Sequence, residues 1–239
     1  MTPEKAQEIF QLLKKHYPNA HMVLNWGNNF ELLVAIILSA QCTDKKVNEV
    51  TSTVFPKYRK ERKELKSRYE ECRKILRQAQ NPMLTNEEVV EIVNFAFVPL
   101  TELEQDIKST GFYHNKAKSV QAAAKVVLDK FHGILPKTIA EMTTIPGVGR
   151  KTANVFLGNV YHISEGIAVD THVTRQAQAL GLTKNTDPVK IEQDLMKLFP
   201  KNQWFPLTYL LIEHGRNMRR KLSDRFMCAD STCILCSQK

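Results

Sequence analysis

The sequence lacks any apolar run long enough to cross a membrane, and it lacks a segment built like a secretion signal. Its longest apolar run is LLVAIIL, seven residues at 32–38, whereas a membrane helix needs about 20. The first eight residues, MTPEKAQE, are polar where a signal peptide has an apolar core. We therefore expect a soluble chain that is not secreted and has no membrane partner.

Cysteine is scarce and unevenly placed. The chain has five cysteines, and an odd number without a secretion signal argues against a framework of disulfides. Cys42 and Cys72 stand alone, whereas Cys228, Cys233 and Cys236 fall within a span of nine residues. A cluster of three thiols indicates a metal or iron–sulfur site.

Runs of alternating apolar residues bounded by turn dipeptides, the signal of β-strands, are also absent. Helix signals recur instead. Thr2-Pro3 and Asp187-Pro188 each place a capping residue before a proline, which suits the first helical position. The sequence therefore predicts an all-α protein of about a dozen helices. Capping boxes of the form Ser/Thr-x-x-Glu are expected at Thr85–Glu88, Thr101–Glu104 and Thr138–Glu141.

Basic residues are in excess. The chain carries 34 Lys and Arg against 25 Asp and Glu, a formal charge of +9, which points to a polyanionic partner such as nucleic acid. The most biased segment, residues 57–77, holds ten basic and four acidic residues. This segment is either a solvated helix face whose charges pair with one another or an additional surface for phosphates.

The most informative stretch is TIPGVGRKTANV at residues 144–155. Gly147 and Gly149 lie between a capped helix at 138–143 and a helix that starts near Arg150. Glycine lets the backbone turn tightly and approach an external group closely, and the next helix points free N–H groups at the same place. The pattern suits a phosphate, although an ordinary connection between two helices can also use Gly-x-Gly.

Two segments narrow this interpretation to a known family. PGVGRKTA at 146–153 resembles the helix-hairpin-helix of the DNA glycosylase superfamily, and AVDTHV at 168–173 resembles the segment that carries its essential aspartate. The matches run in order over most of residues 1–217, with about 30 extra residues between 58 and 99. Further segments resemble the endonuclease III branch: FELLVAIILSAQ at 30–41, GFYHNKA at 111–117 and HGR at 214–216.

The resemblance implies two helical lobes with the substrate cleft between them. A six-helix barrel domain would cover residues 22–163, with the helix-hairpin-helix at about 138–161 and the basic insertion within 58–99. Residues 1–21 and 164–239 would form the second helical domain, which includes the cysteine-containing tail.

The resemblance also implies an activity, that of a bifunctional DNA glycosylase and abasic-site lyase that removes oxidised pyrimidines from duplex DNA. Lys151 would attack the sugar and form a Schiff base, after which β-elimination cleaves the strand. Its position at a helix start beside Arg150 favours a lowered pKa of the amine. Asp170 would stabilise positive charge on the sugar, and it also fits an N-cap. Two alternatives stay open: an adenine or mismatch-type glycosylase, and a non-catalytic DNA-binding protein in which Lys151 holds a phosphate.

An enzyme of this kind must flip the damaged base out of the duplex and fill the gap. By resemblance, Gln41 plugs the gap and the loop at Gly111 wedges into the stack. The family often has leucine after that glycine, whereas this chain has Phe112, which either wedges or packs inward. His172 is more typical of a core or phosphate-contacting residue than of a proton-transfer group. The remaining DNA contacts are expected at Tyr113, Gly147, Val148, Gly149 and Arg150.

The cysteine tail departs from the family. Relatives commonly bind a [4Fe–4S] cluster through four cysteines, the first of which corresponds here to Arg219. Cys228, Cys233 and Cys236 then allow a tail without a cluster, a cluster with an unusual fourth ligand, or a zinc site completed by another residue. The reaction itself requires no metal. We expect a monomer that acts on damaged double-stranded DNA in the cytoplasm, at the nucleoid if the source is bacterial.

Overall fold

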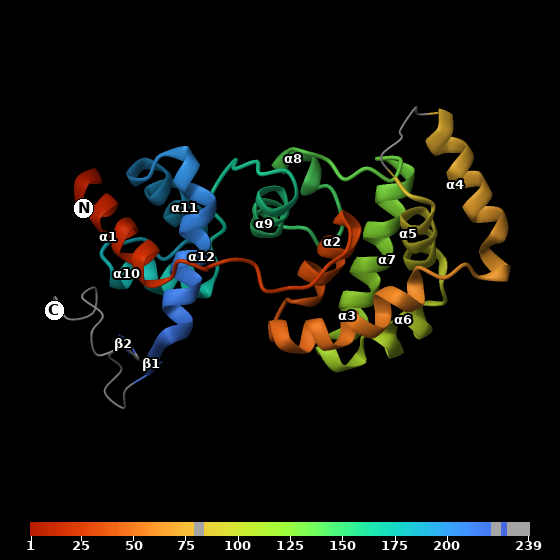
Figure 1. Ribbon diagram of the computed structural model, residues 1–239, viewed down its shortest axis with the longest axis horizontal. Coiled ribbons are helices and arrows are strands. Elements are labelled where there is room, and N and C mark those ends of the chain that lie inside the picture. Colours follow the sequence, from red (N-terminus) through yellow and green to blue (C-terminus); the bar gives the residue numbers. More distant parts are fainter. Residues whose placement is uncertain (79–83, 221–225, 229–239) are drawn as a thin grey trace. The chain divides into compact units, whose positions relative to one another are not determined.

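The computed structural model describes residues 1–78, 84–220 and 226–228 (Figure 1). The all-α prediction is confirmed, because the described residues contain twelve α-helices and only two short strands. The strands are β1 (Met218–Arg220) and β2 (Phe226–Cys228), which pair antiparallel with Arg219 opposite Met227. None of the described helices is long and apolar enough to span a membrane. The chain divides into two compact units, residues 1–22 with 162–239 and residues 23–161.

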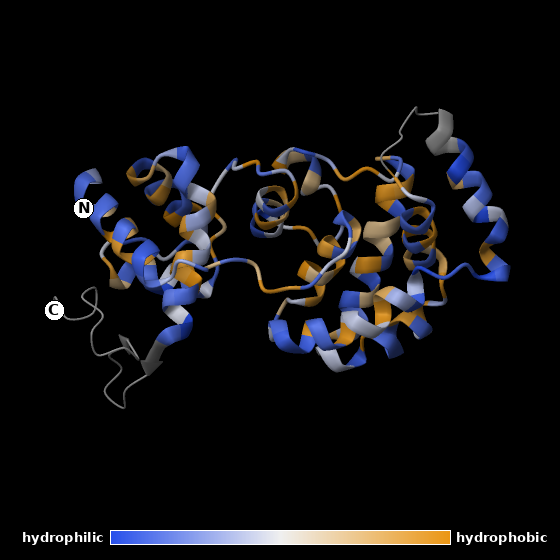
Figure 2. Cartoon of the chain, in the orientation of Figure 1, coloured by the Kyte–Doolittle hydropathy of each residue, from blue (hydrophilic) through white to orange (hydrophobic). Residues whose placement is uncertain are grey.

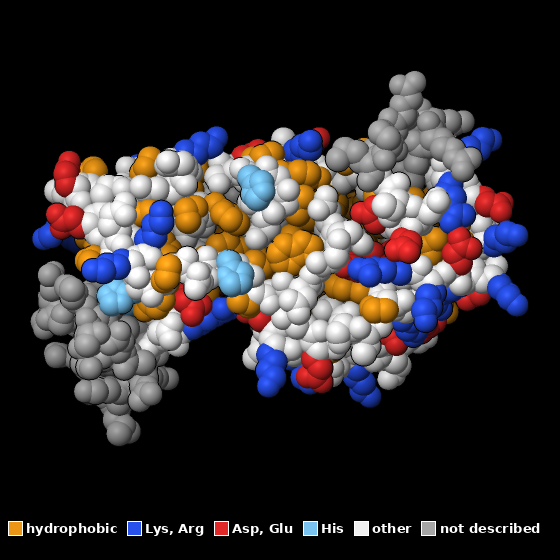
Figure 3. All heavy atoms as spheres, in the orientation of Figure 1, with side chains coloured by type: hydrophobic (Ala, Val, Ile, Leu, Met, Phe, Trp, Pro, Cys, Tyr) orange, Lys and Arg blue, Asp and Glu red, His pale blue; other side chains and the backbone are white. Residues whose placement is uncertain are grey.

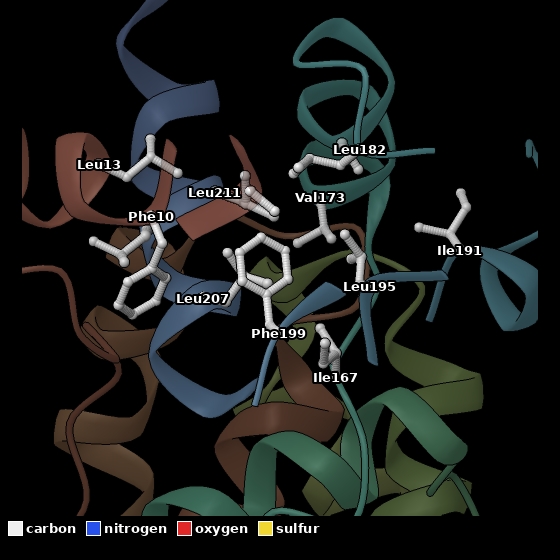
Figure 4. Close-up of a cluster of buried hydrophobic side chains, with 13 residues drawn as sticks. Phe10, Leu13, Ile167, Val173, Leu182, Ile191, Leu195, Phe199, Leu207 and Leu211 are labelled. Carbon is white, nitrogen blue, oxygen red and sulfur yellow. The ribbon is translucent and has the colours of Figure 1, made fainter. Parts of the chain in front are cut away.

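The first unit is built from the two ends of the chain. It contains α1 (Pro3–His16), α10 (Thr171–Ala179), α11 (Pro188–Leu198) and α12 (Lys201–Asn217). Helix α12 packs against both α1 and α10. Apolar side chains from all four helices and from the loops between them meet in one core, where the ring of Phe10 lies 6.2 Å from that of Phe199 (Figure 4). Burial of this apolar surface holds N-terminal and C-terminal helices together.

The second unit is organised around α2 (Asn29–Leu38). Nine of its ten residues are buried, and it is hydrophobic on all sides (Figure 2), as expected for a helix inside a core. Helix α2 packs against α3, α7 and α9, and α5 packs against α7. The other helices of this unit are α3 (Asp44–Tyr58), α4 (Lys66–Gln78), α5 (Asn86–Phe97), α6 (Leu100–Asp106), α7 (Tyr113–Asp129), α8 (Ile139–Met142) and α9 (Arg150–Val160), with 3-10 turns η1 (Lys63–Leu65) and η2 (Lys108–Thr110).

Most of the expected helix starts are confirmed. The side chains of Thr2, Thr138 and Asp187 each accept a hydrogen bond from a backbone N–H in the first turn, and Thr85 forms a complete capping box with Glu88. The box expected at Thr101 is wrong. Helix α6 begins at Leu100, two residues before the start that a cap at Thr101 predicts, with Pro99 in the N-cap position, so Thr101 lies inside the helix.

The basic segment is attached to α5 by a buried polar network. Asn94 on α5 donates its amide to the carbonyls of Tyr58 and Lys60, at 2.6 and 2.9 Å. Its amide oxygen accepts a 2.6 Å hydrogen bond from Tyr69, whose hydroxyl also accepts from the backbone of Arg62. Tyr69 is 1% exposed, so α4 packs one of its faces against α5 and is not surrounded by solvent.

Charges of the basic segment are extensively paired. Five of its cations form ion pairs, and three of the acidic partners come from other parts of the unit. Arg62, and then Lys57, hold the pKa of Glu102 at about 2. Figure 3 shows basic and acidic side chains interleaved at the end of the second unit that carries α4. The paired cations are Lys57, Arg59, Arg62, Arg68 and Arg73.

A buried carboxylate cluster joins this segment to the start of α2. Glu31 forms an ion pair with Arg59 and accepts a hydrogen bond from the backbone of Gly27. Glu91, which is fully buried, accepts a 2.6 Å hydrogen bond from the amide of Asn28. Burial, and then the negative charge of Glu31, raise the pKa of Glu91 well above its usual range. The folded protein therefore favours the protonated form of Glu91.

Candidate functional site

The turn of the hairpin between α8 and α9 fits closely against the rest of the second unit, on α7 and α2. Gly147 has φ +79°, a conformation that favours glycine. A methyl group added there would lie 2.9 Å from Cβ of Ser119 on α7 and 3.7 Å from Ile37 on α2. Val148 turns its side chain inward and is only 5% exposed. The turn therefore presents its backbone outward, while Gly147 and Val148 seat it on α7 and α2.

Gly149 has a different reason to be glycine. It is the N-cap of α9 with φ −89°, which any residue can adopt, and a methyl group added to it would meet no atom within 4 Å. No side chain caps the N-terminus of α9. Arg150 and Lys151, the first two residues of the helix, are both exposed. Free N–H groups, the positive end of the helix dipole and two cations thus gather on an open surface, which is suited to an anion.

The expected plug and wedge residues share an unusual backbone conformation. Gln41, two residues after the C-cap of α2, has φ +51°, and Phe112, the N-cap of α7, has φ +49°. Residues other than glycine rarely adopt this left-handed region, and such strain concentrates at functional sites. Both side chains are exposed, Phe112 by 64%. The alternative in which Phe112 packs inward is therefore wrong for this structure.

Helix α7 connects the wedge loop, which we define as residues 110–113, to the hairpin. Phe112 precedes its first residue, Tyr113, which is half-buried. Ser119 contacts the hairpin at Gly147, and Lys130, just after the helix, donates a 3.0 Å hydrogen bond to Thr144. One helix thus fixes the wedge loop and the hairpin within the second unit.

Lys116 was not singled out from the sequence, although it lies in the matched segment at 111–117. It is 5% exposed, and its Nζ donates a 2.7 Å hydrogen bond to the carbonyl of Thr110. Desolvation lowers the pKa of this amine. A sequence signal does exist, because Lys116 stands on the same helical face as buried Val120, Ala124 and Val127, where a lysine is out of place.

Asp170 and His172 lie in the first unit, at the start of α10. Asp170 is the N-cap that the sequence predicts, since its carboxylate accepts a 2.8 Å hydrogen bond from the backbone of Val173. His172 is half-buried, and a methyl group added at Gly215 on α12 would lie 2.9 Å from its Nδ1. His214, next to that glycine, hydrogen-bonds Tyr17 at 3.0 Å, and burial lowers its pKa to about 4.

The expected metal ligands fall largely outside the described residues. Cys233 and Cys236 lie in 229–239, and Cys228 ends β2 without a described side chain. In the described part of the chain, no group of three or more His, Cys, Asp and Glu side chains is placed to hold a metal ion. Cys42 and Cys72 are free thiols there.

Comparison with known proteins places the chain in a family. Residues 34–201 match the HhH-GPD superfamily base excision DNA repair proteins. Endonuclease III of Synechocystis sp. is 41% identical, covering 89% of this chain and 83% of the relative; that of Bacillus subtilis is 37% identical, covering 93% and 87%. The chain belongs to the endonuclease III family. It is accordingly a DNA glycosylase and abasic-site lyase of base excision repair.

The solved structures of endonuclease III agree in fold. A non-covalent endonuclease III–DNA complex is similar with a TM-score of 0.78 and 34% identity, covering 99% of this chain and 96% of that chain. A trapped endonuclease III–DNA covalent intermediate is similar with a TM-score of 0.74 and 36% identity, covering 90% and 87%. The similarity extends over nearly the whole length of both partners.

Proposed function

We propose that this endonuclease III homologue removes oxidised pyrimidines from duplex DNA with Lys151 as its nucleophile. The observation that supports this role most directly is the position of Lys151, exposed in the uncapped first turn of α9 directly after the hairpin turn. In this proposal the amine attacks C1′ of the damaged nucleotide while the bond from C1′ to the base breaks, and the base leaves with a proton. Opening of the sugar ring gives an iminium between Lys151 and C1′.

The same intermediate accounts for strand cleavage. The iminium withdraws electrons from C1′, so the proton on C2′ becomes acidic and can be lost to a base. The electron pair released by that proton forms the C2′–C3′ double bond and expels the 3′ phosphate. Water then hydrolyses the iminium and releases Lys151. This sequence requires no oxidant or metal, and none of its steps involves the tail cysteines.

Asp170 has the complementary role in the proposal. A carboxylate stabilises positive charge that develops on the sugar, and it can move protons to and from the amine. The hydrogen bond from Val173 fixes one carboxylate oxygen, Oδ1, which orients the group for that role. His172, packed at Gly215, is assigned a supporting or phosphate-contacting role and not proton transfer.

The hairpin and the two strained loops supply the DNA-binding part of the proposal. The backbone N–H groups of Gly147 and Gly149 and the cation of Arg150 would hold a phosphate of the damaged strand. The N–H of Val148 is not among them, because it donates to the carbonyl of Ile145 within the turn. Gln41 would fill the gap left by the flipped base and hydrogen-bond the orphaned partner base, while Phe112 would wedge into the stack with support from Tyr113. The proposed partner is thus damaged double-stranded DNA, bound by one copy of the chain.

Borohydride trapping tests the nucleophile. On a duplex with one abasic site or one oxidised pyrimidine, the protein should form a covalent adduct after reduction of the iminium. Lys151→Gln should reduce trapping by about 1,000-fold or more, because the amide cannot form the iminium. Lys125→Gln is the matched control, since Lys125 is an exposed lysine on α7 to which the proposal gives no role, and it should trap normally.

The rivals give different results in this experiment. An adenine or mismatch-type glycosylase would release its base without an adduct. A non-catalytic DNA-binding protein would bind the duplex and leave it intact. Failure of the unaltered protein to trap on either substrate would refute the lysine mechanism.

The tail is the one part of the proposal that involves a cofactor. Cys228, Cys233 and Cys236 provide three thiolates, one short of the usual set for a [4Fe–4S] cluster. An absorbance scan of anaerobically purified protein, together with iron and zinc analysis, distinguishes the three open arrangements of the tail. The proposed chemistry at Lys151 holds in each of them.

A further inference from the structure

The wedge loop has a backbone that must be held in place. Gly111 has φ +70° and ψ 156°, a region that is open essentially only to glycine, and Phe112 follows with φ +49° and ψ 27°. Phe112 is the N-cap of α7 but makes no capping hydrogen bond through its side chain. A phenylalanine in this region costs about 1–3 kcal/mol unless its surroundings enforce it. Most of its ring lies in solvent, so the ring itself supplies little of that enforcement.

Lys116 supplies a fixed point directly before this pair of residues. Its Nζ donates a 2.7 Å hydrogen bond to the carbonyl of Thr110, the residue that precedes Gly111. Thr110 is 2% exposed, and its hydroxyl donates a 2.8 Å hydrogen bond to the carbonyl of Ile107. The peptide that leads into the left-handed turn is therefore anchored on both sides, in a region without access to water.

A lysine at this position is unfavourable for packing alone. It lies in the first turn of α7, where a cation opposes the helix dipole. It is also buried, and the loss of solvent lowers the pKa of its amine. A methionine would pack there without a desolvation penalty. What an apolar side chain could not provide is a donor for the Thr110 carbonyl.

We propose that Lys116 is a positioning residue that holds the wedge loop in its DNA-inserting shape before DNA is bound. This inference rests on the proposed function, because it assigns Phe112 to the base stack. By fixing the Thr110 carbonyl, Lys116 keeps Phe112 projecting outward, so insertion does not have to order the loop first. Lys116 does not contact the reacting atoms and is not a catalytic residue.

The test compares abasic-site cleavage in duplex and in single-stranded DNA. A single strand has no base stack to open, so only the duplex reaction requires the wedge. Lys116→Met removes the donor and preserves the apolar stem. We expect the ratio of duplex to single-strand rates to fall about tenfold, since a loop that must be ordered first weakens insertion. The ratio does not depend on the fraction of active protein. Lys125→Met, an exposed lysine on the same helix, should leave it unchanged.

Combination with Phe112→Ala shows whether Lys116 acts through the wedge. If it does, Lys116→Met should change the ratio less than twofold in a chain that already lacks the ring, because coupled residues are not additive. Gly111→Ala provides a second route should Lys116→Met fail to fold. It meets no atom within 4 Å, so it disturbs only the loop backbone, and it should lower the ratio in the same way.

Each outcome is decisive. If Lys116→Met lowers the cleavage rate equally on duplex and on single-stranded DNA, the lysine has only a structural role and the inference is overturned. The inference is also overturned if Lys116→Met lowers the duplex-to-single-strand ratio equally with and without the Phe112 ring. If the unaltered protein traps normally and Lys116→Met has an unchanged ratio of duplex to single-strand cleavage, the inference is overturned and the proposed function stands. Absence of trapping by the unaltered protein would refute the proposed function, and the inference with it.

Discussion

Two regions of the second unit differ in how they are built. The first is the face that contains the hairpin and the strained loops at Gln41 and Phe112, and the second is the end that contains the basic segment, residues 57–77. The first is marked by its backbone, with left-handed residues at Gln41, Phe112 and Gly147. The second contains ten basic residues, spread over the end of α3, the connection that follows it and α4. Among its described side chains, five cations are paired with carboxylates. Within this unit, the positions proposed for DNA contact and for the nucleophile lie beside the constrained backbone and not in the segment with the largest excess of charge.

The comparison shows that net charge is a poor guide to the DNA-binding face. Residues 57–77 carry a surplus of six positive charges, yet Glu31, Glu102 and Asp106 from outside the segment pair with Lys57, Arg59 and Arg62, which leaves a surplus of three. Buried hydrogen bonds of Asn94 and Tyr69 explain why the segment is folded onto α5. Its charges serve the fold to a large extent.

The largest effect that would sharpen the comparison comes from the two glycines of the hairpin. Gly147→Ala places a methyl group 2.9 Å from Ser119 and imposes a left-handed alanine. We expect the free energy of unfolding to fall by about 2 kcal/mol. Gly149→Ala meets no atom of the protein, so stability should change by less than about 0.5 kcal/mol. Urea denaturation of both variants measures the difference.

DNA affinity separates the two glycines further. If the backbone at Gly149 approaches a phosphate, its methyl group should weaken duplex binding about tenfold with no loss of stability, which a titration with labelled duplex measures. Unchanged affinity in Gly149→Ala would contradict the hairpin as a phosphate site. Equal stability of the two alanine variants would contradict the internal role assigned to Gly147.

An effect that depends on pH is expected from the buried acid of the other region. The pKa of Glu91 is raised in the folded state, so above the unfolded value of 4.5 the folded protein holds a proton that the unfolded chain has lost. Stability therefore falls as pH rises from that value towards the folded pKa. Glu91→Gln keeps the hydrogen bond from Asn28 and needs no proton.

The variant should gain stability relative to the unaltered protein as pH rises from 5 to 8, by up to about 1 kcal/mol per pH unit. Urea denaturation at several pH values measures this gain. Glu87→Gln, an exposed carboxylate on the same helix, is the control and should show no such trend. A constant difference between Glu91→Gln and the unaltered protein at all pH values would mean that Glu91 is ionised in the fold. Abasic-site cleavage should be unaffected in both variants.

Sequence signals were sufficient where one short segment determines the outcome. The caps at Thr85, Thr138 and Asp170 depend on side chains three residues from their partners, and all three are confirmed. The cap at Thr101 failed because the same local pattern occurs one residue inside a helix that Pro99 starts. Local patterns cannot distinguish these cases when a neighbouring residue is the better start.

The rest depends on contacts between distant segments. Lys116 and its carbonyl partner are six residues apart, but only the fold shows that the amine is buried and donates to that carbonyl. Asn94 bonds to Tyr58 across 36 positions, and Glu91 to Asn28 across 63. No periodicity marks these pairs. The roles of Lys151, Asp170 and Gln41 stay predictions, because they concern atoms of a bound duplex.

The smallest expected effect is the sharpest test of the comparison. Four exposed lysines of the basic segment are not among its five paired cations: Lys60, Lys63, Lys66 and Lys74. If they contacted phosphates, their replacement by alanine would reduce the slope of log affinity against log salt by roughly 0.9 for each contact, or about 3–4 in all. We expect a change below about 1, because we propose that the duplex is bound by the constrained face elsewhere in the unit. Arg150→Ala, a single change at the hairpin, should alter the slope by about as much as all four lysines together. A large change from the lysines would instead make the basic segment a second DNA-binding surface, and charge would then be a better guide to the binding face than backbone geometry.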